Sequence, residues 1–358
     1  MSVLFTPTQL GDTPLANRIV MAPMTRGRAG ESRIPNDMMV EYYSQRASSG
    51  LIITEATAID AMGYGWNGAP ALYTDEQEAG WKRVTQAVHD KGGRIFLQLW
   101  HMGRVSHPDF LAGETPVGPS PIAAAGHAHT YTGSKSYVTP RALEAKELAG
   151  VAQAFADGAT RAIRAGFDGV EVHSANGYLL DQFLRDGSNQ RDDEFGGSIE
   201  NRMRFPLMVV QAVTDAVGAS RVGVRISPTN VYNDMKDSDS MALFTQYAGE
   251  LDQLNLAYLH VLEAFSKDHM LFTDTEMHTP HLRKAYTGHL MINGGYDAQT
   301  GEAALESGLG NSIAYGVPLL ANPDLVERYR DGKPLNTPDF DTFYTHDAKG
   351  YTDYPTAE

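Results

Sequence analysis

Three features that many proteins have are missing from this sequence. Cysteine is absent from its 358 residues, which excludes disulfide bonds, thiolate metal ligands and a cysteine nucleophile. No run approaches the roughly 18 apolar residues of a membrane-spanning helix, and the N-terminus lacks the basic and apolar regions of a signal peptide. Positive charge is scarce: 29 Lys and Arg face 44 Asp and Glu, and the resulting net charge of −15 opposes binding to nucleic acid or to an anionic membrane. We therefore expect a cytoplasmic protein that binds neither nucleic acid nor a membrane.

The chain contains enough apolar sequence to bury a large core. Hydrophobic residues make up 42% and charged residues 20%, which is typical of a globular protein. Length alone would allow two domains, but α/β barrels commonly run past about 250 residues as one unit. No repeat, linker or low-complexity segment marks a boundary, so we expect a single domain over residues 1–358.

Short apolar runs alternate with amphipathic helical segments, and this alternation predicts a (β/α)8 TIM barrel. A hairpin from Phe5 to Asn17, turning at Gly11 and Asp12, is expected to close the barrel floor. Residues 101–142 are rich in Gly, Pro, Ser, Ala and His without a sustained period, so we expect a capping insertion after the third strand. Strands are expected at 18–21, 51–53, 94–100, from 169, and at 221–226, 257–262, 290–293 and 312–315, and helices at 36–49, 75–91, 144–165 and 198–217.

The fourth strand ends in a cluster of polar side chains. His173, Asn176 and Tyr178 follow Val170 and Val172 within a few residues. The carboxyl ends of barrel strands build active sites, and these residue types can donate hydrogen bonds to an oxygen or give up a proton. The alternative is that Asn176 and Gly177 form an ordinary turn, so the stretch needs support from other strand ends.

That support comes from a resemblance to a known family. The sequence HSANGYLLDQFLRDGSN (173–189), followed by EFGGSIENRMRFP (194–206), resembles the central signature of the old yellow enzyme family of FMN-dependent ene-reductases. Similar matches run along essentially the whole chain. The resemblance implies that His173 and Asn176 hold the activating group of the substrate and that Tyr178 protonates it.

Two polar residues in other predicted strands suit a flavin ring. A flavin needs an amide along its pyrimidine edge and a positive charge near N1 and O2, and Gln98 and Arg225 supply these groups. The alternative is that Arg225 pairs with a core carboxylate and that Gln98 is a satisfied core amide. The resemblance assigns both to the flavin, and it adds the backbone of Pro23, Met24 and Ala56 and the hydroxyl of Thr25.

The FMN phosphate is expected over the loops after strands seven and eight, where backbone N–H groups bind anions. Gly294, Gly295 and Gly316 permit a close approach of the backbone. The AFGR pattern of the family is replaced here by Ala314-Tyr315-Gly316-Val317, so the phosphate-binding arginine is absent. Arg283 is one candidate for a substitute cation.

Three aromatic residues match those that line the pocket of the family: Tyr64, Trp100 and Tyr351. Plain packing of aromatic rings remains an equal alternative for Trp100. Thr25 stands where some members have cysteine, so the chain resembles the branch with morphinone, N-ethylmaleimide and nitrate-ester reductases.

The resemblance implies an NAD(P)H-dependent FMN oxidoreductase that reduces the activated C=C bond of α,β-unsaturated carbonyl or nitro compounds, as a monomer or homodimer. Two other classes remain open: a non-catalytic flavin- or ligand-binding barrel, and a barrel enzyme using metal or lysine chemistry. Against metal, His127 and His129 lie on a Gly/Ala-rich stretch without a carboxylate beside them, so we expect no metal site. Against a Schiff base, none of the eight predicted strands contains a lysine.

Overall fold

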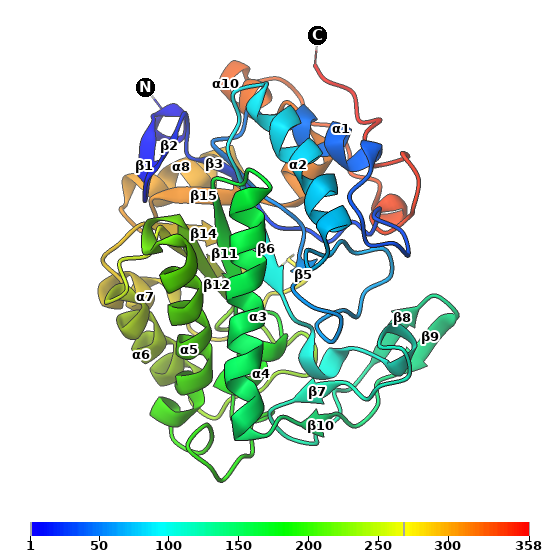
Figure 1. The fold of residues 1–358 in the computed structure, drawn as a ribbon. Helices are drawn as coiled ribbons and strands as arrows, with labels where there is room; N and C mark the ends of the chain where they lie inside the picture. Colours follow the sequence, from blue (N-terminus) through cyan, green and yellow to red (C-terminus); the bar gives the residue numbers. More distant parts are fainter. Residues whose placement is uncertain (1, 268, 358) are drawn as a thin grey trace.

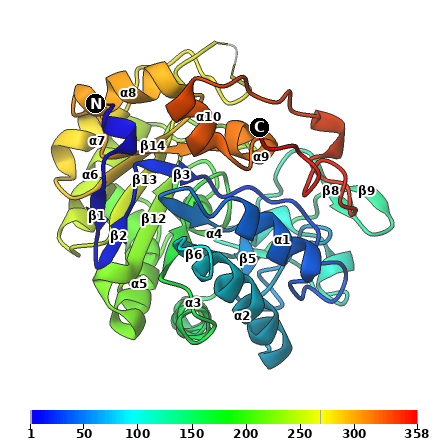
Figure 2. The same cartoon turned by 90° about the horizontal axis from the view of Figure 1, so that it is seen from above.

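A closed ring of eight parallel strands is the centre of the fold (Figure 1, Figure 2). The computed structural model describes residues 2–267 and 269–357. Strand β6 pairs with β11 as well as with β4, and this pairing closes the barrel. The strands are β3 (Ile19–Met21), β4 (Leu51–Ile53), β6 (Ile95–Trp100), β11 (Gly169–His173), β12 (Val222–Ile226), β13 (Tyr258–Leu262), β14 (Leu290–Asn293) and β15 (Ser312–Tyr315). The predicted (β/α)8 barrel is confirmed, with strand bounds that differ by no more than one residue.

Helices surround the ring on its outer side (Figure 2). Their starts follow from local capping: the Thr74 side chain and Gln77 form a capping box, and the Ser198 hydroxyl accepts from the N–H of Asn201, as expected. The helices are α1 (Asp37–Gln45), α2 (Asp75–His89), α3 (Ala145–Arg164), α4 (Leu179–Leu184), α5 (Ile199–Val217), α6 (Ser240–Asp252), α7 (Thr279–Ala285), α8 (Ala298–Glu306), α9 (Val317–Ala321) and α10 (Leu325–Asp331). Short 3-10 turns occupy Val3–Phe5, Gly103–Val105, Pro108–Phe110, Ala219–Arg221 and Phe340–Thr342.

The N-terminal hairpin closes one end of the barrel, as predicted. Strands β1 (Thr8–Leu10) and β2 (Thr13–Leu15) pair in antiparallel register. Leu10 and Leu15 belong to the buried cluster inside the ring, together with Phe96 and Tyr258. Because the N–H of Asp12 also bonds the carbonyl just before β12, the hairpin lies at the amino-terminal ends of the strands. The opposite end is left for the loops that follow the strands.

The segment 101–142 is more ordered than its composition suggested. Strand β7 (Val117–Gly118) pairs in parallel with β10 (Arg141–Ala142), and β8 (His127–Thr130) forms a hairpin with β9 (Gly133–Ser136). A further short strand, β5 (Thr57–Ala58), extends the edge of β6. In Figure 1 the insertion of residues 101–142, with β7 to β10, projects at the lower right, remote from the β1–β2 hairpin at the upper left.

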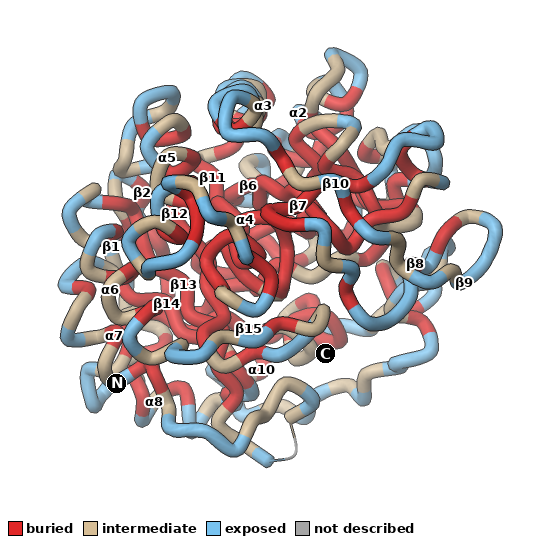
Figure 3. The backbone as a smooth tube through the Cα atoms, turned by 90° about the horizontal axis from the view of Figure 1, so that it is seen from below, coloured by how far each residue is buried: buried red, intermediate tan, exposed pale blue. Residues whose placement is uncertain are grey.

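Burial follows the layers of the fold. Figure 3 shows buried backbone gathered in the strands and the inward sides of the helices, with exposed residues on the outer turns. Within residues 2–267 and 269–357, none of the helices combines the length and apolarity needed to cross a bilayer.

The barrel interior has no room for an added methyl group at Gly223 on β12. A Cβ there would lie 2.1 Å from Cζ of the buried Tyr258 ring. We expect Gly223→Ala to lower the unfolding free energy by about 1–3 kcal/mol, the range for overpacking. The matched control is Gly249→Ala in α6, where a Cβ would meet nothing within 4 Å. Urea denaturation of both variants tests the expectation, and equal stabilities would contradict it.

Candidate active site

Parallel pairing brings polar residues of neighbouring strands side by side in the barrel. Gln98 on β6 is the register partner of Glu171 on β11, and Arg225 on β12 stands between His173 and His260. All of these side chains are buried. Strands that are far apart in sequence therefore bring one set of polar groups together.

A buried carboxylate that the sequence analysis missed organises this set. Glu171 Oε1 accepts from Gln98 Nε2 at 2.8 Å, and its Oε2 lies 2.8 Å from His260 Nδ1. Burial lowers the pKa of His260, so its neutral ring donates to the carboxylate. Burial alone would raise the pKa of Glu171, but His260, Arg225 and Gln98 outweigh it and lower that pKa. The available signal was the carboxylate inside the apolar strand sequence GVEVH, because a buried charge requires partners.

Arg225 has N–H donors that are not all used in hydrogen bonds. Its Nη2 donates to Asn293 Oδ1 at 2.9 Å, and Nε is buried without a hydrogen-bond partner among the described residues. Among the residues that the structure describes, Arg225 forms no ion pair with Glu171 or another carboxylate. Burial lowers the pKa of Arg225, although Glu171 opposes the shift. The amide nitrogen of Gln98 is therefore satisfied within the core, whereas Arg225 keeps one N–H group without a partner among the described residues.

The loop after β11 turns at Asn176, which has a φ of 58°. Its N–H donates to Ser227 Oγ at 2.8 Å, and its Oδ1 accepts from Asn230 Nδ2 at 2.7 Å. These bonds fix the amide orientation and leave the NH2 group of Asn176 without a partner among the residues described. The segment is the turn that its Asn-Gly dipeptide suggested, and it also presents a free donor.

An ion pair beneath the turn holds it in place. The N–H of Gly177 donates to Asp181 Oδ2 at 2.8 Å, and Arg185 Nε donates to Asp181 Oδ1 at 2.9 Å. Arg185 Nη2 also bonds the carbonyl of Ser227 at 2.6 Å. Asp181 is fully buried, and burial raises its pKa despite the neighbouring guanidinium. The turn thus depends on a carboxylate that sequence reasoning did not identify.

His173 and Tyr178 lie next to each other at the end of β11. Their ring centroids are 5.0 Å apart, and Tyr178 also meets Trp100 edge to face at 5.1 Å. Nδ1 of His173 is buried without a partner in the described part of the chain, and burial and Arg225 lower the pKa of His173 well below its usual range. Burial raises the pKa of Tyr178 well above its usual value, so its phenol stays protonated. The pair therefore offers neutral N–H and O–H donors.

The predicted cofactor residues Pro23, Met24, Thr25, Ala56 and Gly316 follow neighbouring strands. Pro23 and Ala56 are buried, whereas Met24, Thr25 and Gly316 are partly exposed. Sδ of Met24 lies 3.5 Å from where a Cβ on Gly316 would be. The Glu55 carboxylate holds the first of these loops, because its Oε2 accepts from the N–H groups of Arg26 and Gly27.

The aromatic residues expected in the pocket are packed deeply. Tyr64, Trp100 and Tyr351 are all 0% exposed. The Tyr64 hydroxyl lies 3.0 Å from that of Tyr131 on the insertion, and Tyr351 stacks on Tyr42 with centroids 4.0 Å apart. Their contact with a ligand therefore stays a prediction.

Two further candidates lie away from these strand ends. Arg283 bonds Asn311 Oδ1 at 3.0 Å and the carbonyl of Gly288 at 3.0 Å, both just before strands β15 and β14. The Arg283 guanidinium is therefore bonded at the amino-terminal end of the barrel, away from the phosphate loops. The idea that it replaces the missing arginine is wrong. His127 and His129 are both exposed on strand β8, and among the described residues no group of three or more metal-ligating side chains forms.

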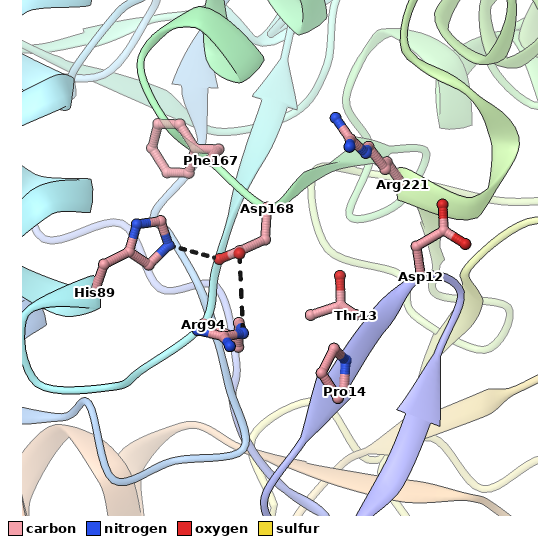
Figure 4. A pocket seen from close by; sticks show the side chains of 8 residues that line it. All are labelled: Asp12, Thr13, Pro14, His89, Arg94, Phe167, Asp168 and Arg221. Atoms are coloured by element: carbon pink, nitrogen blue, oxygen red, sulfur yellow. Dashed lines mark hydrogen bonds and ion pairs between the residues drawn. The ribbon is translucent and has the colours of Figure 1, made fainter.

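A polar pocket of about 480 Å³ also opens at the floor (Figure 4). His89 Nε2 lies 2.9 Å from Asp168 Oδ2, and Arg94 approaches the same carboxylate from the other side. The walls of the pocket come from the β1–β2 hairpin, the end of α2 and the residues just before strands β6, β11 and β12. The pocket is thus separated by the barrel from the residues of the candidate active site.

Known proteins resemble this chain over nearly its whole length. Residues 3–336 match the NADH:flavin oxidoreductase / NADH oxidase family. A probable flavin mononucleotide-dependent alkene reductase from Leishmania infantum is 44% identical over 361 residues, covering 99% of this chain and 98% of that protein. The 12-oxophytodienoate reductase 1 of Oryza sativa subsp. japonica is 42% identical over 363 residues, covering 99% of this chain and 93% of that one.

Solved structures give the same result. The old yellow enzyme homologue from Zymomonas mobilis superposes with a TM-score of 0.96 at 44% identity, covering 98% of this chain and 99% of its own. Morphinone reductase superposes with a TM-score of 0.95 at 46% identity, covering 99% of this chain and 96% of its own. The fold and these relatives identify the chain as a flavin-dependent oxidoreductase barrel. The chain belongs to the NADH:flavin oxidoreductase / NADH oxidase family, that of old yellow enzyme, and is an FMN-dependent enzyme with a nicotinamide reductant.

The ion pair beneath the Asn176 turn gives a stability test. Asp181→Ala leaves the buried Arg185 guanidinium without its carboxylate, so the unfolding free energy should fall by about 3–5 kcal/mol. The double variant Asp181→Ala/Arg185→Met removes the unpaired charge and should recover part of this loss. Urea unfolding followed by circular dichroism measures both. A double variant less stable than the single one would argue against an unpaired charge as the cause.

Proposed function

We propose that this enzyme reduces the C=C bond of an alkene conjugated to a carbonyl or nitro group, with Tyr178 as the proton donor. The observation that carries the proposal is the set of polar groups at the end of β11. His173 Nδ1 is buried without a partner among the described residues, its ring centroid lies 5.0 Å from that of Tyr178, and Arg225 is its register partner on β12. The NH2 group of Asn176, in the loop that follows, has no partner in the same part of the chain. Buried polar atoms without partners are costly in a resting protein, so His173 Nδ1 and Arg225 Nε point to a ligand at this site.

The residues at the strand ends fit FMN. Gln98 Nε2 donates to Glu171, which leaves the amide oxygen of Gln98 to accept a hydrogen bond from a ligand. The N3–H group of a flavin needs such an acceptor. The unpartnered Nε of Arg225 supplies a donor and a positive charge for the N1 and O2 edge. In the proposal the backbone of Pro23, Met24 and Ala56 and the hydroxyl of Thr25 contact the remaining ring edge. Gly294, Gly295 and Gly316 approach the phosphate.

When bound, FMN supplies hydride chemistry: a hydride is taken from NADH or NADPH and given to the alkene carbon furthest from the activating group. His173 and Asn176 donate hydrogen bonds to the carbonyl or nitro oxygen, where negative charge develops. Tyr178 gives a proton to the carbon next to the activating group, which completes the addition of two hydrogens. A low pKa keeps His173 neutral, so it orients and polarises rather than protonates.

The reductant and substrate class rest on the relatives. A morphinone reductase structure holds tetrahydroNAD, and the Leishmania infantum relative is described as an alkene reductase. Tyr64, Trp100 and Tyr351 are proposed as the aromatic wall of the substrate pocket.

The visible spectrum of the purified protein tests the proposal. Anaerobic NADH or NADPH should bleach the flavin absorbance, and cyclohexenone should then restore it. Bound flavin that is bleached but not restored by enones or nitroalkenes would remove the alkene reductase assignment. Bound flavin without any turnover would favour a binding protein, and activity without flavin would favour metal or lysine chemistry.

Tyr178→Phe separates the two half-reactions. The substitution removes a proton donor and leaves hydride transfer intact, so bleaching by nicotinamide should change little. Reoxidation by cyclohexenone should slow by roughly 10²–10⁴-fold, the range for general acid catalysis. A nitroalkene should show a smaller effect, because its reduced product can leave before it is protonated. Stopped-flow traces in which both half-reactions slow equally would mean that Tyr178 is structural.

Asn230→Asp tests the orientation of the Asn176 amide. A carboxylate cannot donate to Asn176 Oδ1, so the amide must turn over and give its NH2 group to residue 230 instead of the substrate. Enone reduction should fall by about 10²-fold, as on loss of one oxyanion donor. Asn176→Ala provides the reference, and FMN content provides the control for folding. If Asn230→Asp is as active as the parent while Asn176→Ala is impaired, the orienting role is refuted.

A further inference from the structure

The loops after β14 and β15 lack the cation expected beside a bound phosphate. In TIM barrels these loops commonly bind phosphate through backbone N–H groups, and Gly295, with a φ of 99°, is exposed there. Val317 offers no charge at the start of α9. A phosphate dianion held by backbone dipoles alone would lack a charged or side-chain donor.

The nearby arginines have their donors engaged elsewhere. Arg283 is bound at the barrel floor. Arg46 is fully buried, with Nε and Nη2 bonded to the carbonyls of Leu319 and Leu320 at 2.9 and 2.7 Å. Neither can turn to the phosphate loops without losing these bonds.

A histidine from the loop after β13 lies against Gly295 instead. Cδ2 of His269 is 3.1 Å from where a Cβ on Gly295 would be, and Cδ2 is bonded to Nε2. Nδ1 of His269 accepts from the N–H of Leu271 at 3.2 Å, so in the neutral ring the proton sits on Nε2. Partial burial lowers the pKa of His269, which keeps that neutral form dominant before an anion binds.

We infer that His269 is a cofactor-binding residue that donates from Nε2 to the FMN phosphate, in place of the arginine missing at Val317. This inference rests on the proposed position of FMN over Gly294, Gly295 and Gly316. It assigns to the loop after β13 a part in holding the phosphate.

Comparing FMN with riboflavin isolates the phosphate contact. Flavin fluorescence titration of the full-length apoprotein should give an FMN dissociation constant that rises by about 10- to 100-fold in His269→Ala, as on loss of a hydrogen bond to a charged group. Riboflavin, which has no phosphate, should bind the parent and His269→Ala equally. His269→Gln, which keeps an N–H donor, should lose less than His269→Ala.

Two further variants supply the rescue and the control. Val317→Arg in the His269→Ala background should restore much of the FMN affinity. Lys267→Ala should leave the affinity near that of the parent. An unchanged FMN constant in His269→Ala, an equal loss for riboflavin, or a loss in Lys267→Ala alone would overturn the inference. A parent protein that binds neither flavin would refute the proposed FMN site itself, which is a separate result.

Discussion

The hydrogen bonds of one buried carboxylate organise the centre of this barrel. Glu171 lies on β11, where β6 and β12 pair with it, and it takes bonds from Gln98 and His260. A fully buried charge is stable only when its partners hold it on more than one side. The same bonds determine that the nitrogen of the Gln98 amide faces Glu171. The orientation of the Gln98 amide is therefore a consequence of the need to pair a buried carboxylate.

A second buried carboxylate holds the turn that follows β11. Asp181 binds the N–H of Gly177 and the guanidinium of Arg185, and thereby fixes a turn in which Asn176 adopts a positive φ. Asparagine tolerates this conformation better than most residues. Asn230 then holds the amide oxygen, and the NH2 group is left for a ligand. The positive φ of Asn176 and the hydrogen bond from Asn230 together leave the NH2 group of Asn176 available.

Much of the fold was predictable because its signals are local. Buried parallel strands read as short apolar runs such as Leu51–Ile53 and Leu290–Asn293, and helix starts carry capping residues such as Ser198. The insertion was less predictable. Its short pairs, such as Val117–Gly118 with Arg141–Ala142, join segments far apart in sequence, and two residues carry no detectable period. The same limit applied to Arg283, whose place at the floor depends on its contact with Asn311.

Strand periodicity and residue chemistry are properties of adjacent positions, so they were enough to predict the barrel, the polar residues at its strand ends and the departure at Val317. Tertiary structure alone decided which of those polar groups are already satisfied. Gln98 has a partner on its nitrogen, Arg225 Nε has none among the described residues, and His269 meets Gly295 across two loops. Whether a donor already has a hydrogen-bond partner depends on which strands and loops lie beside it. In a parallel barrel these neighbours come from distant parts of the chain.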